Sequence, residues 1–101
     1  MKGLGYFFVF EMDHAYTMHY TYVLRSLKDR ELYVGSTADL QRRFTEHQSG
    51  RAEATAPRRP FELLFYEAFK CKADAERRER YLKSTKGRRS LRQILQESLA
   101  R

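Results

Sequence analysis

Two short segments near the start of the chain, residues 20–24 and 31–34, have the pattern of β-strands. The first alternates residues of high strand propensity, as expected for a strand with two different faces. The segment Leu27-Lys28-Asp29-Arg30 lies between them and predicts a turn. It lacks the Asn-Gly or Asp-Gly pair of a two-residue turn, so we expect a longer loop built on a type I turn. Together these segments predict a β-hairpin closed by Gly35.

A helical pattern follows the hairpin. Within residues 40–47, a leucine, a phenylalanine and a histidine recur at helical spacing. Ser36 is followed three residues later by Asp39, which resembles a capping box and predicts a helix that begins behind Ser36 and its neighbour Thr37. Gly50 is placed to end this helix. Residues 51–60 are polar, carry two prolines, and predict a loop.

The second half of the chain predicts one more strand and two helices. Residues 61–69 are aromatic or apolar on both alternating faces, which favours a central strand covered on two sides. A helix starting at Ala73 or Asp74 would be interrupted within residues 83–87, and a terminal amphipathic helix would carry a stripe of Leu91, Ile94, Leu95 and Leu99. The order ββαβαα predicts an α/β (α+β) sandwich with a three-stranded antiparallel or mixed sheet flanked by about three helices.

Residues 1–18 do not follow this pattern, and we interpret them as an N-terminal extension to a single domain over residues 19–101. The apolar run of residues 6–10 is too short to span a bilayer. Acidic residues at 11 and 13, without a small-residue cleavage site, speak against a secretory signal. An extra edge strand, a frayed tail and an over-long translation start are alternative interpretations.

The composition is that of a folded chain, with 42% apolar and 14% aromatic residues. Cys71 is the single cysteine, so an intramolecular disulfide is excluded, and this suits a reducing, cytoplasmic location. We expect Cys71 to be a small packing residue.

The positive charge is concentrated in the last third of the chain. Residues 1–69 hold nine basic and nine acidic side chains, whereas residues 70–101 hold eleven basic and four acidic ones, which accounts for the whole net charge of +7. Such a segment favours polyanionic partners. We expect a phosphate-contacting surface here; the alternative is a solvated basic helix face.

Several motifs, in this order and spacing, resemble the GIY-YIG nuclease family. The second hallmark triplet reads Tyr33-Val34-Gly35, and the first reads Tyr20-Thr21-Tyr22, which keeps the tyrosine but has Tyr20 in place of glycine, a bulk that would narrow the site. The segment Leu40-Gln41-Arg42-Arg43-Phe44, followed by His47, matches the family's arginine-bearing helix. Residues 58–61 and 75–83 resemble its later motifs. The chain is most similar to small single-domain members related to the nuclease domain of the bacterial excision-repair UvrC proteins.

The resemblance implies a metal-dependent endonuclease that hydrolyses phosphodiester bonds of DNA, selects structure rather than sequence, and acts in repair or recombination. It implies that Tyr22 and Tyr33 face the site and that Tyr22 helps to deprotonate the attacking water. A free tyrosine pKa near 10 must be lowered by cations or metal for that role. Arg43 follows Tyr33 by ten residues and matches the arginine expected to hold the scissile phosphate.

Glu79 shares the spacing of an inward helical stripe with Ala75 and Leu82. A carboxylate there is costly unless it is paired, hydrogen-bonded or bound to metal. An ion pair with Arg80, Lys83 or another base is the structural alternative. The resemblance makes Glu79 the expected ligand of Mg²⁺, with Mn²⁺ as a substitute, because Mg²⁺ takes one or two protein oxygens and completes its shell with water and phosphate.

His47 lies one helical turn after Arg43 on the same face. It is either a packing residue or a fifth candidate catalytic residue that binds phosphate or relays a proton. The expected partners are branched or damaged DNA and a protein that supplies specificity, with no membrane. A catalytically weak nucleic-acid-binding module and a protein-interaction domain are the alternative functions. The candidate DNA contacts are Arg58, Arg59, Arg77, Arg80, Lys83, Lys86, Arg88 and Arg89.

Overall fold

The computed structural model describes residues 17–101. The interpretation of residues 1–18 as an extension lies outside the described residues except for 17 and 18, which directly precede the first strand. The elements are β1 (His19–Ser26), β2 (Leu32–Thr37), α2 (Leu40–Ser49), the short 3₁₀ helix η1 (Ala56–Arg58), β3 (Phe61–Phe69), α3 (Lys72–Lys83), α4 (Thr85–Ile94) and α5 (Gln96–Leu99). Within the described residues, no helix is both long enough and apolar enough to cross a membrane.

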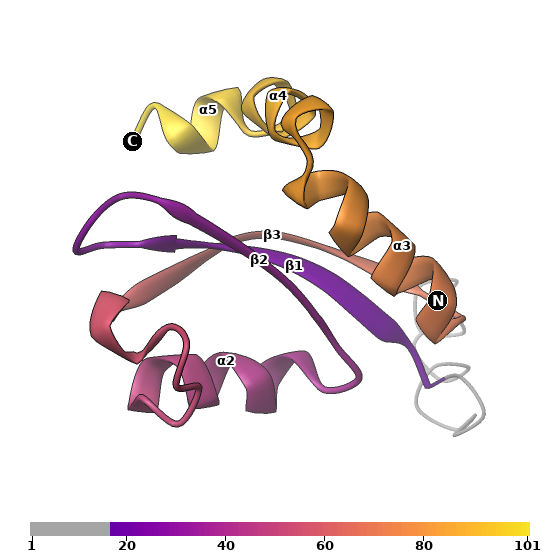
Figure 1. Ribbon diagram of the computed structural model, residues 1–101, viewed down its shortest axis with the longest axis horizontal. Coiled ribbons are helices and arrows are strands. Elements are labelled where there is room, and N and C mark those ends of the chain that lie inside the picture. The colour runs from indigo at the N-terminus through magenta and orange to yellow at the C-terminus, as the bar shows by residue number, and fades with distance from the viewer. Residues whose placement is uncertain (1–16) are drawn as a thin grey trace, which may run out of the picture.

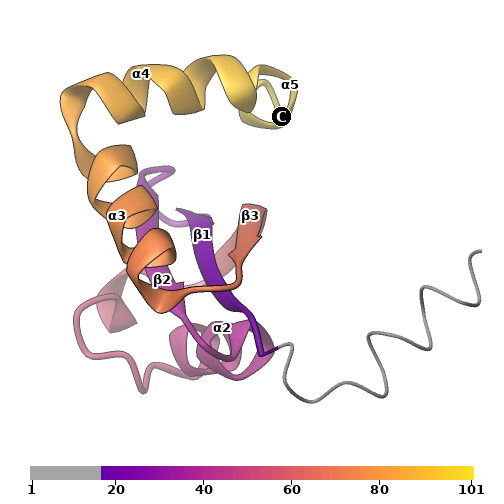
Figure 2. The same cartoon turned by 90° about the vertical axis from the view of Figure 1, so that its right-hand side faces the viewer.

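The three strands form one antiparallel sheet in the order β2-β1-β3. Helix α2 covers one face, and α3, α4 and α5 lie on the other, giving three layers (Figure 1 and, from the side, Figure 2). The predicted three-stranded α+β architecture is confirmed. The prediction that residues 61–69 form the central strand is wrong, because β1 pairs with both neighbours and β3 is an edge. Leu63 and Tyr66 on β3 are 37% and 52% exposed, so this apolar strand is only partly covered by the rest of the protein.

Two cores lie on opposite faces of the sheet, because alternate residues of β1 point to opposite sides. On the α3 side, Val23 and Val34 are buried with three leucines of the last helices, namely Leu82, Leu91 and Leu95. On the α2 side the buried residues are Tyr22, Leu24 and Phe61, with Tyr33, Leu40 and Phe44 packed against them. The hairpin is therefore buried on both faces, which holds its tyrosines in fixed positions.

Helix α2 begins later than the capping-box pattern predicts. Strand β2 continues through Thr37, and Asp39 is the N-cap, its carboxylate accepting a hydrogen bond from the backbone N–H of Arg42 at 3.1 Å. The start behind Ser36 is therefore wrong by three residues, because Ser36 pairs with Thr21 in the sheet. Gly50 ends the helix as predicted, with a φ of 85°.

Ser84 separates α3 from α4, within the interruption that the sequence predicts. Its hydroxyl accepts a hydrogen bond from the N–H of Gly87 at 3.1 Å, so it caps the second helix. Gly87 lies inside α4, where a Cβ would come within 1.9 Å of the carbonyl oxygen of Tyr81. The predicted leucine stripe is confirmed except at Ile94, which is 47% exposed. Cys71 is exposed at the start of α3, so the expected packing role is wrong.

Candidate active site

The hairpin places two tyrosines side by side on the α2 face of the sheet. Tyr22 pairs with Gly35 across the hairpin and Tyr33 pairs with Leu24, and the two tyrosine rings are 6.4 Å apart. The Tyr22 hydroxyl lies over Gly35, because a Cβ built there would be 2.5 Å from that oxygen. The glycine of the second triplet therefore makes room for the tyrosine of the first.

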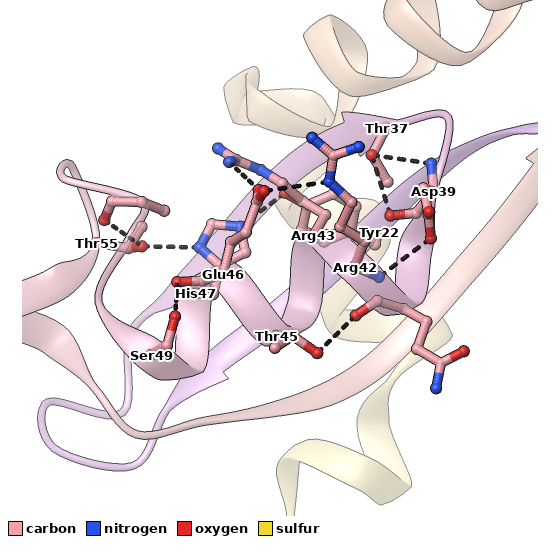
Figure 3. Close-up of polar contacts among 12 residues, drawn as sticks. Tyr22, Thr37, Asp39, Arg42, Arg43, Thr45, Glu46, His47, Ser49 and Thr55 are labelled. Carbon is pink, nitrogen blue, oxygen red and sulfur yellow. Dashed lines mark hydrogen bonds and ion pairs between the residues drawn. The ribbon is translucent and has the colours of Figure 1, made fainter.

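His47 lies on α2 and packs against both tyrosines. It is fully buried, with its ring 5.0 Å from that of Tyr33 and 5.7 Å from that of Tyr22. Its Nε2 lies 2.8 Å from the Tyr22 hydroxyl, and its Nδ1 lies 2.7 Å from Oγ1 of Thr55 (Figure 3). His47 is thus a packing residue and also the polar partner of Tyr22.

Arg43 stands one turn earlier on α2, at the rim of the site. Its Nη1 donates to Oε1 of Glu46 at 2.9 Å, and Glu46 also pairs with Nε of Arg42 at 3.4 Å (Figure 3). The hydrogen bond with Glu46 raises the pKa of Arg43, and contact with the Tyr22 hydroxyl adds to that effect. A hollow of about 190 Å³ opens beside this pair, lined by Thr37, Ala38, Asp39, Arg42, Arg43 and Glu46.

At neutral pH, Tyr22 and His47 have the protonation states of a free tyrosine and a free, neutral imidazole. Burial raises the pKa of Tyr22 to about 12, although the hydrogen bond with Arg43 opposes this change. Burial lowers the pKa of His47 to about 4, and the positive charge of Arg43 acts in the same direction. At neutral pH Tyr22 is therefore protonated and His47 is neutral. The lowered tyrosine pKa that a water-activating role requires is absent from this form of the site.

Glu79 approaches the same edge of β2 from α3. Its Oε1 accepts a hydrogen bond from the Ser36 hydroxyl at 2.6 Å, and its Oε2 accepts one from Nζ of Lys83 at 2.8 Å. Burial alone would raise the pKa of Glu79, but the bonds from Lys83 and Ser36 outweigh it and lower that pKa. The carboxylate is ionised and near enough that its charge raises the pKa of Tyr22. The ion pair with Lys83 is the one that the sequence offered as an alternative to metal binding.

The residues around Glu79 fit a metal ion that keeps most of its water ligands. Within residues 17–101, no three histidine, cysteine, aspartate or glutamate side chains are grouped as metal ligands. A single carboxylate beside the Ser36 hydroxyl fits a hydrated Mg²⁺ that takes most of its ligands from water and substrate phosphate. It does not fit an ion such as Zn²⁺ that the protein alone would hold in a closed shell.

Tyr20, which replaces the glycine of the first triplet, packs against β3. Its ring meets that of Tyr66 edge-on, with the two centroids 5.9 Å apart. Tyr20 lies opposite Thr37 and Ala68, two pairs beyond Tyr22 in the register of the sheet. The extra bulk is therefore accommodated on the β3 side, and Tyr22 still reaches across Gly35.

The structure divides the eight candidate DNA contacts into three groups. Arg58 binds Asp29 at 2.9 Å, holding the pKa of that carboxyl at about 2, and Arg59 donates to the carbonyl of Ala56 at 2.8 Å. Both therefore fasten the loop that packs against α2. On the other side of the sheet, Arg77 is paired with Asp74, and Lys83 with Glu79. Four candidates have no carboxylate within ion-pair distance in the described part of the chain: Arg80, Lys86, Arg88 and Arg89.

Sequence reasoning named Ser36 only as a helix cap, and it missed Glu46 and Thr55 altogether. Glu46 binds Arg43, and the only signal for it was the three-residue spacing between them on a helix. Thr55 binds His47 from within the polar loop, and no periodicity marks it. Its burial depends on how residues 51–60 fold back over α2.

Fold and site together define a small α+β domain whose polar groups converge at one edge of a β-hairpin. The chain belongs to the GIY-YIG catalytic domain family, a nuclease family, whose model matches residues 18–92. The resemblance carried by the triplets and by the helix of Arg43 is thereby confirmed.

The relatives carry the designation UPF0213. The UPF0213 protein of Bacillus pumilus is 47% identical over 62 residues, covering 60% of this chain and 62% of that protein, which is less than two thirds of its length. The UPF0213 protein of Staphylococcus haemolyticus is 36% identical over 77 residues, covering 75% of this chain and 93% of that protein. The solution NMR structure of a UPF0213 protein from Bacillus halodurans is 38% identical, covers 76% of this chain and 84% of that one, and has a TM-score of 0.48.

Proposed function

We propose that this protein is a metal-dependent endonuclease that hydrolyses phosphodiester bonds of DNA. The observation that carries the proposal is the hydrogen bond between Nε2 of His47 and the Tyr22 hydroxyl, with the guanidinium of Arg43 near enough to affect the pKa of Tyr22. This chain of groups lies where the hairpin leaves space over Gly35, with an ionised carboxylate nearby. It offers a proton acceptor, a phosphate ligand and a carboxylate at one edge of the sheet, as phosphodiester hydrolysis requires.

Arg43 would bind the scissile phosphate. Its planar guanidinium donates two parallel hydrogen bonds to phosphate oxygens and stabilises charge that develops in the transition state. Glu46 holds that guanidinium in the present structure, so binding requires phosphate to replace the carboxylate. The Tyr33 hydroxyl, which has no hydrogen-bond partner among residues 17–101, is available to orient the water or the phosphate.

Tyr22 and His47 would act as a proton relay. As the water oxygen bonds to phosphorus, its proton passes to the Tyr22 oxygen while the Tyr22 proton passes to Nε2 of His47. The bond from phosphorus to the 3′ oxygen breaks, leaving a 5′-phosphate and, after proton uptake, a 3′-hydroxyl. Phosphate bound to Arg43 offsets the positive charge that lowers the pKa of His47, so substrate makes the imidazole more basic.

Glu79, with the Ser36 hydroxyl beside it, would hold a hydrated Mg²⁺. When bound, such an ion neutralises phosphate charge and orients the phosphate oxygens. Lys83, which is paired with Glu79 in this structure, would contact the DNA backbone once the metal ion takes its place on the carboxylate. Branched or damaged DNA is the substrate class we propose, in repair or recombination and in the reducing cytoplasm. A protein partner that supplies specificity completes this proposal.

Nicking of supercoiled plasmid at low salt tests this function, with Mg²⁺, with Mn²⁺ and with a chelator. We expect nicking that depends on metal. Its rate should fall at least 100-fold in both Glu79→Ala and Arg43→Ala, which is roughly the contribution of such groups to the rate in other enzymes. Glu76→Ala is the matched control, since it removes a carboxylate from the same helix one turn from the site. Nicking that survives both site substitutions would refute the proposed residues.

One observation favours a second candidate, a nucleic-acid-binding module without efficient chemistry. Tyr22 is only 1% exposed and Arg43 is held by Glu46, so the site is closed in this form. The basic side chains of α4 are free of carboxylates among the described residues and would still bind phosphate. Retardation of DNA without nicking under any metal would establish this alternative. Absence of DNA binding at low salt would instead favour a protein-interaction domain that uses the same basic surface.

A further inference from the structure

Thr55 is a buried hydroxyl that the reaction outlined above does not use. It precedes η1, is 1% exposed, and lies eight residues beyond His47 in the chain. Its Oγ1 is 2.7 Å from Nδ1 of His47 and 3.3 Å from the carbonyl oxygen of Ala52. A chain of four groups therefore runs from Tyr22 through His47 and Thr55 to the backbone of Ala52 (Figure 3 shows its Thr55 end).

The protons of this chain can be arranged in two ways. If His47 carries its proton on Nδ1, Tyr22 donates to Nε2, Nδ1 donates to Thr55, and Thr55 donates to the Ala52 carbonyl. Each of these three protons then has an acceptor. If His47 carries its proton on Nε2, that nitrogen donates to the Tyr22 oxygen and Thr55 donates to Nδ1.

The second arrangement leaves the proton of Tyr22 without an acceptor. Among the described residues, Nε2 of His47 is the one acceptor within hydrogen-bond distance of that hydroxyl, and in this arrangement it is itself a donor. Tyr22 is 1% exposed, and an unpaired buried hydroxyl costs roughly 1–3 kcal/mol. The count of donors and acceptors therefore favours the proton on Nδ1.

We propose that Thr55 is a positioning residue that holds His47 in its Nδ1–H tautomer and so leaves Nε2 free to accept the proton of Tyr22. The proposal rests on the proposed function for its catalytic consequence, but the tautomer itself is a property of the resting protein. With its own proton donated to the carbonyl of Ala52, the Thr55 oxygen can accept the Nδ1 proton while Nε2 accepts from Tyr22. An apolar side chain of the same shape would leave Nδ1–H buried and unpaired.

¹⁵N NMR of the imidazole nitrogens at pH 7 tests the tautomer, with the His47 signals assigned by their loss in His47→Gln. We expect a protonated Nδ1 and an unprotonated Nε2 in the parent protein. Thr55→Ser should keep this state, because serine retains the hydroxyl. Thr55→Val, which is nearly isosteric, should shift the nitrogens toward the other tautomer or a mixture.

Plasmid nicking by the same variants gives the second readout. Thr55→Ser should stay within about threefold of the parent, whereas Thr55→Val should lose roughly 10- to 100-fold, as when a group that orients a functional histidine is removed. Glu53→Ala, an exposed change in the same loop, is the control and should alter neither readout.

Three results would overturn the inference: a parent protein with Nε2–H, a serine variant that loses the Nδ1–H state, or a folded valine variant that keeps it. If the valine variant fails to fold, the parent and the serine variant still decide. If no form nicks DNA but the tautomer responds as expected, the positioning role holds and the proposed nuclease function fails.

Discussion

At the scale of single residues, the contacts in this structure work against the reaction that we propose for the site. Glu46 occupies Arg43, and burial keeps the proton on Tyr22 and off His47. A phosphate bound to Arg43 would displace the carboxylate of Glu46 and offset the positive charge that lowers the pKa of His47. The resting structure is therefore consistent with a site that substrate opens.

Glu46→Gln should strengthen DNA binding. Removing the carboxylate frees Arg43 from a partly exposed ion pair worth up to about 1 kcal/mol, so we expect roughly 2- to 5-fold tighter binding at low salt. Fluorescence anisotropy with a labelled duplex measures this change. Glu53→Gln makes the same change of charge in the following loop and is the control. Weaker binding by Glu46→Gln would mean that Glu46 orients Arg43 rather than withholding it.

His47 should make the folded protein sensitive to mild acid. Its pKa is about 4 when folded and 6.5 in its ordinary state, so between these pH values the unfolded chain binds a proton that the folded protein does not. The free energy of unfolding should therefore fall by roughly 3 kcal/mol as the pH drops from 6.5 to 4. Urea unfolding across this range measures it. His47→Gln should remove most of this slope; an unchanged slope would assign it to other groups.

At the scale of elements, local sequence patterns predict which strands and helices form, whereas tertiary contacts decide where they end. The hairpin, three helical segments and the stop at Gly50 follow from periodicity and backbone preferences. Ser36 was a plausible cap, but its pairing with Thr21 extends β2 and passes that role to Asp39. The apolar run of β3 suggested a central strand, whereas strand order depends on pairing between distant segments.

The same division applies to the site. The resemblance to the family's motifs implies a site made of Tyr22, Tyr33, Arg43, His47 and Glu79. The structure groups the first four on the α2 face, and Glu79 reaches the same edge. Thr55 and the pairing of Arg58 with Asp29 could not be named, because both depend on how the loop closes over α2.

Gly87 tests the packing of α4 against α3. Alanine would raise helix propensity by up to about 1 kcal/mol, but its Cβ would meet the Tyr81 carbonyl at 1.9 Å and the Leu82 Cα at 2.6 Å. Because both contacts are backbone atoms, the helices must separate, and we expect Gly87→Ala to lower the free energy of unfolding by about 1–3 kcal/mol.

Chemical denaturation measures this loss, with Lys86→Ala as the control at an exposed position of the same helix. The control should be neutral or slightly stabilising. A Gly87→Ala protein as stable as the parent would mean that α4 can shift without cost.

At the scale of the whole molecule, basic side chains lie on both sides of the sheet and differ in how they are engaged. Arg58 and Arg59 belong to the α2 layer and are engaged in its loop, while the basic residues of α3 and α4 lie across the sheet (Figure 2). The site sits at the β2 edge, between these layers. We expect a DNA backbone that reaches Arg43 to continue past the β2 edge onto α3 and α4. Arg58 and Arg59 should contribute little, because they are engaged in their own loop.

The double variant Lys86→Ala/Arg89→Ala tests this path. Both side chains are exposed and lack carboxylate partners within the described residues, whereas Arg88 is half-buried and is left in place. Each lost phosphate contact should lower the slope of log Kd against log salt by roughly 0.9, so we expect a decrease of up to about 2. Lys28→Ala/Arg51→Ala removes the same charge from the α2 side and should leave the slope unchanged. Because net charge is equal in the two variants, a difference between them locates the DNA, and equal slopes would place it elsewhere.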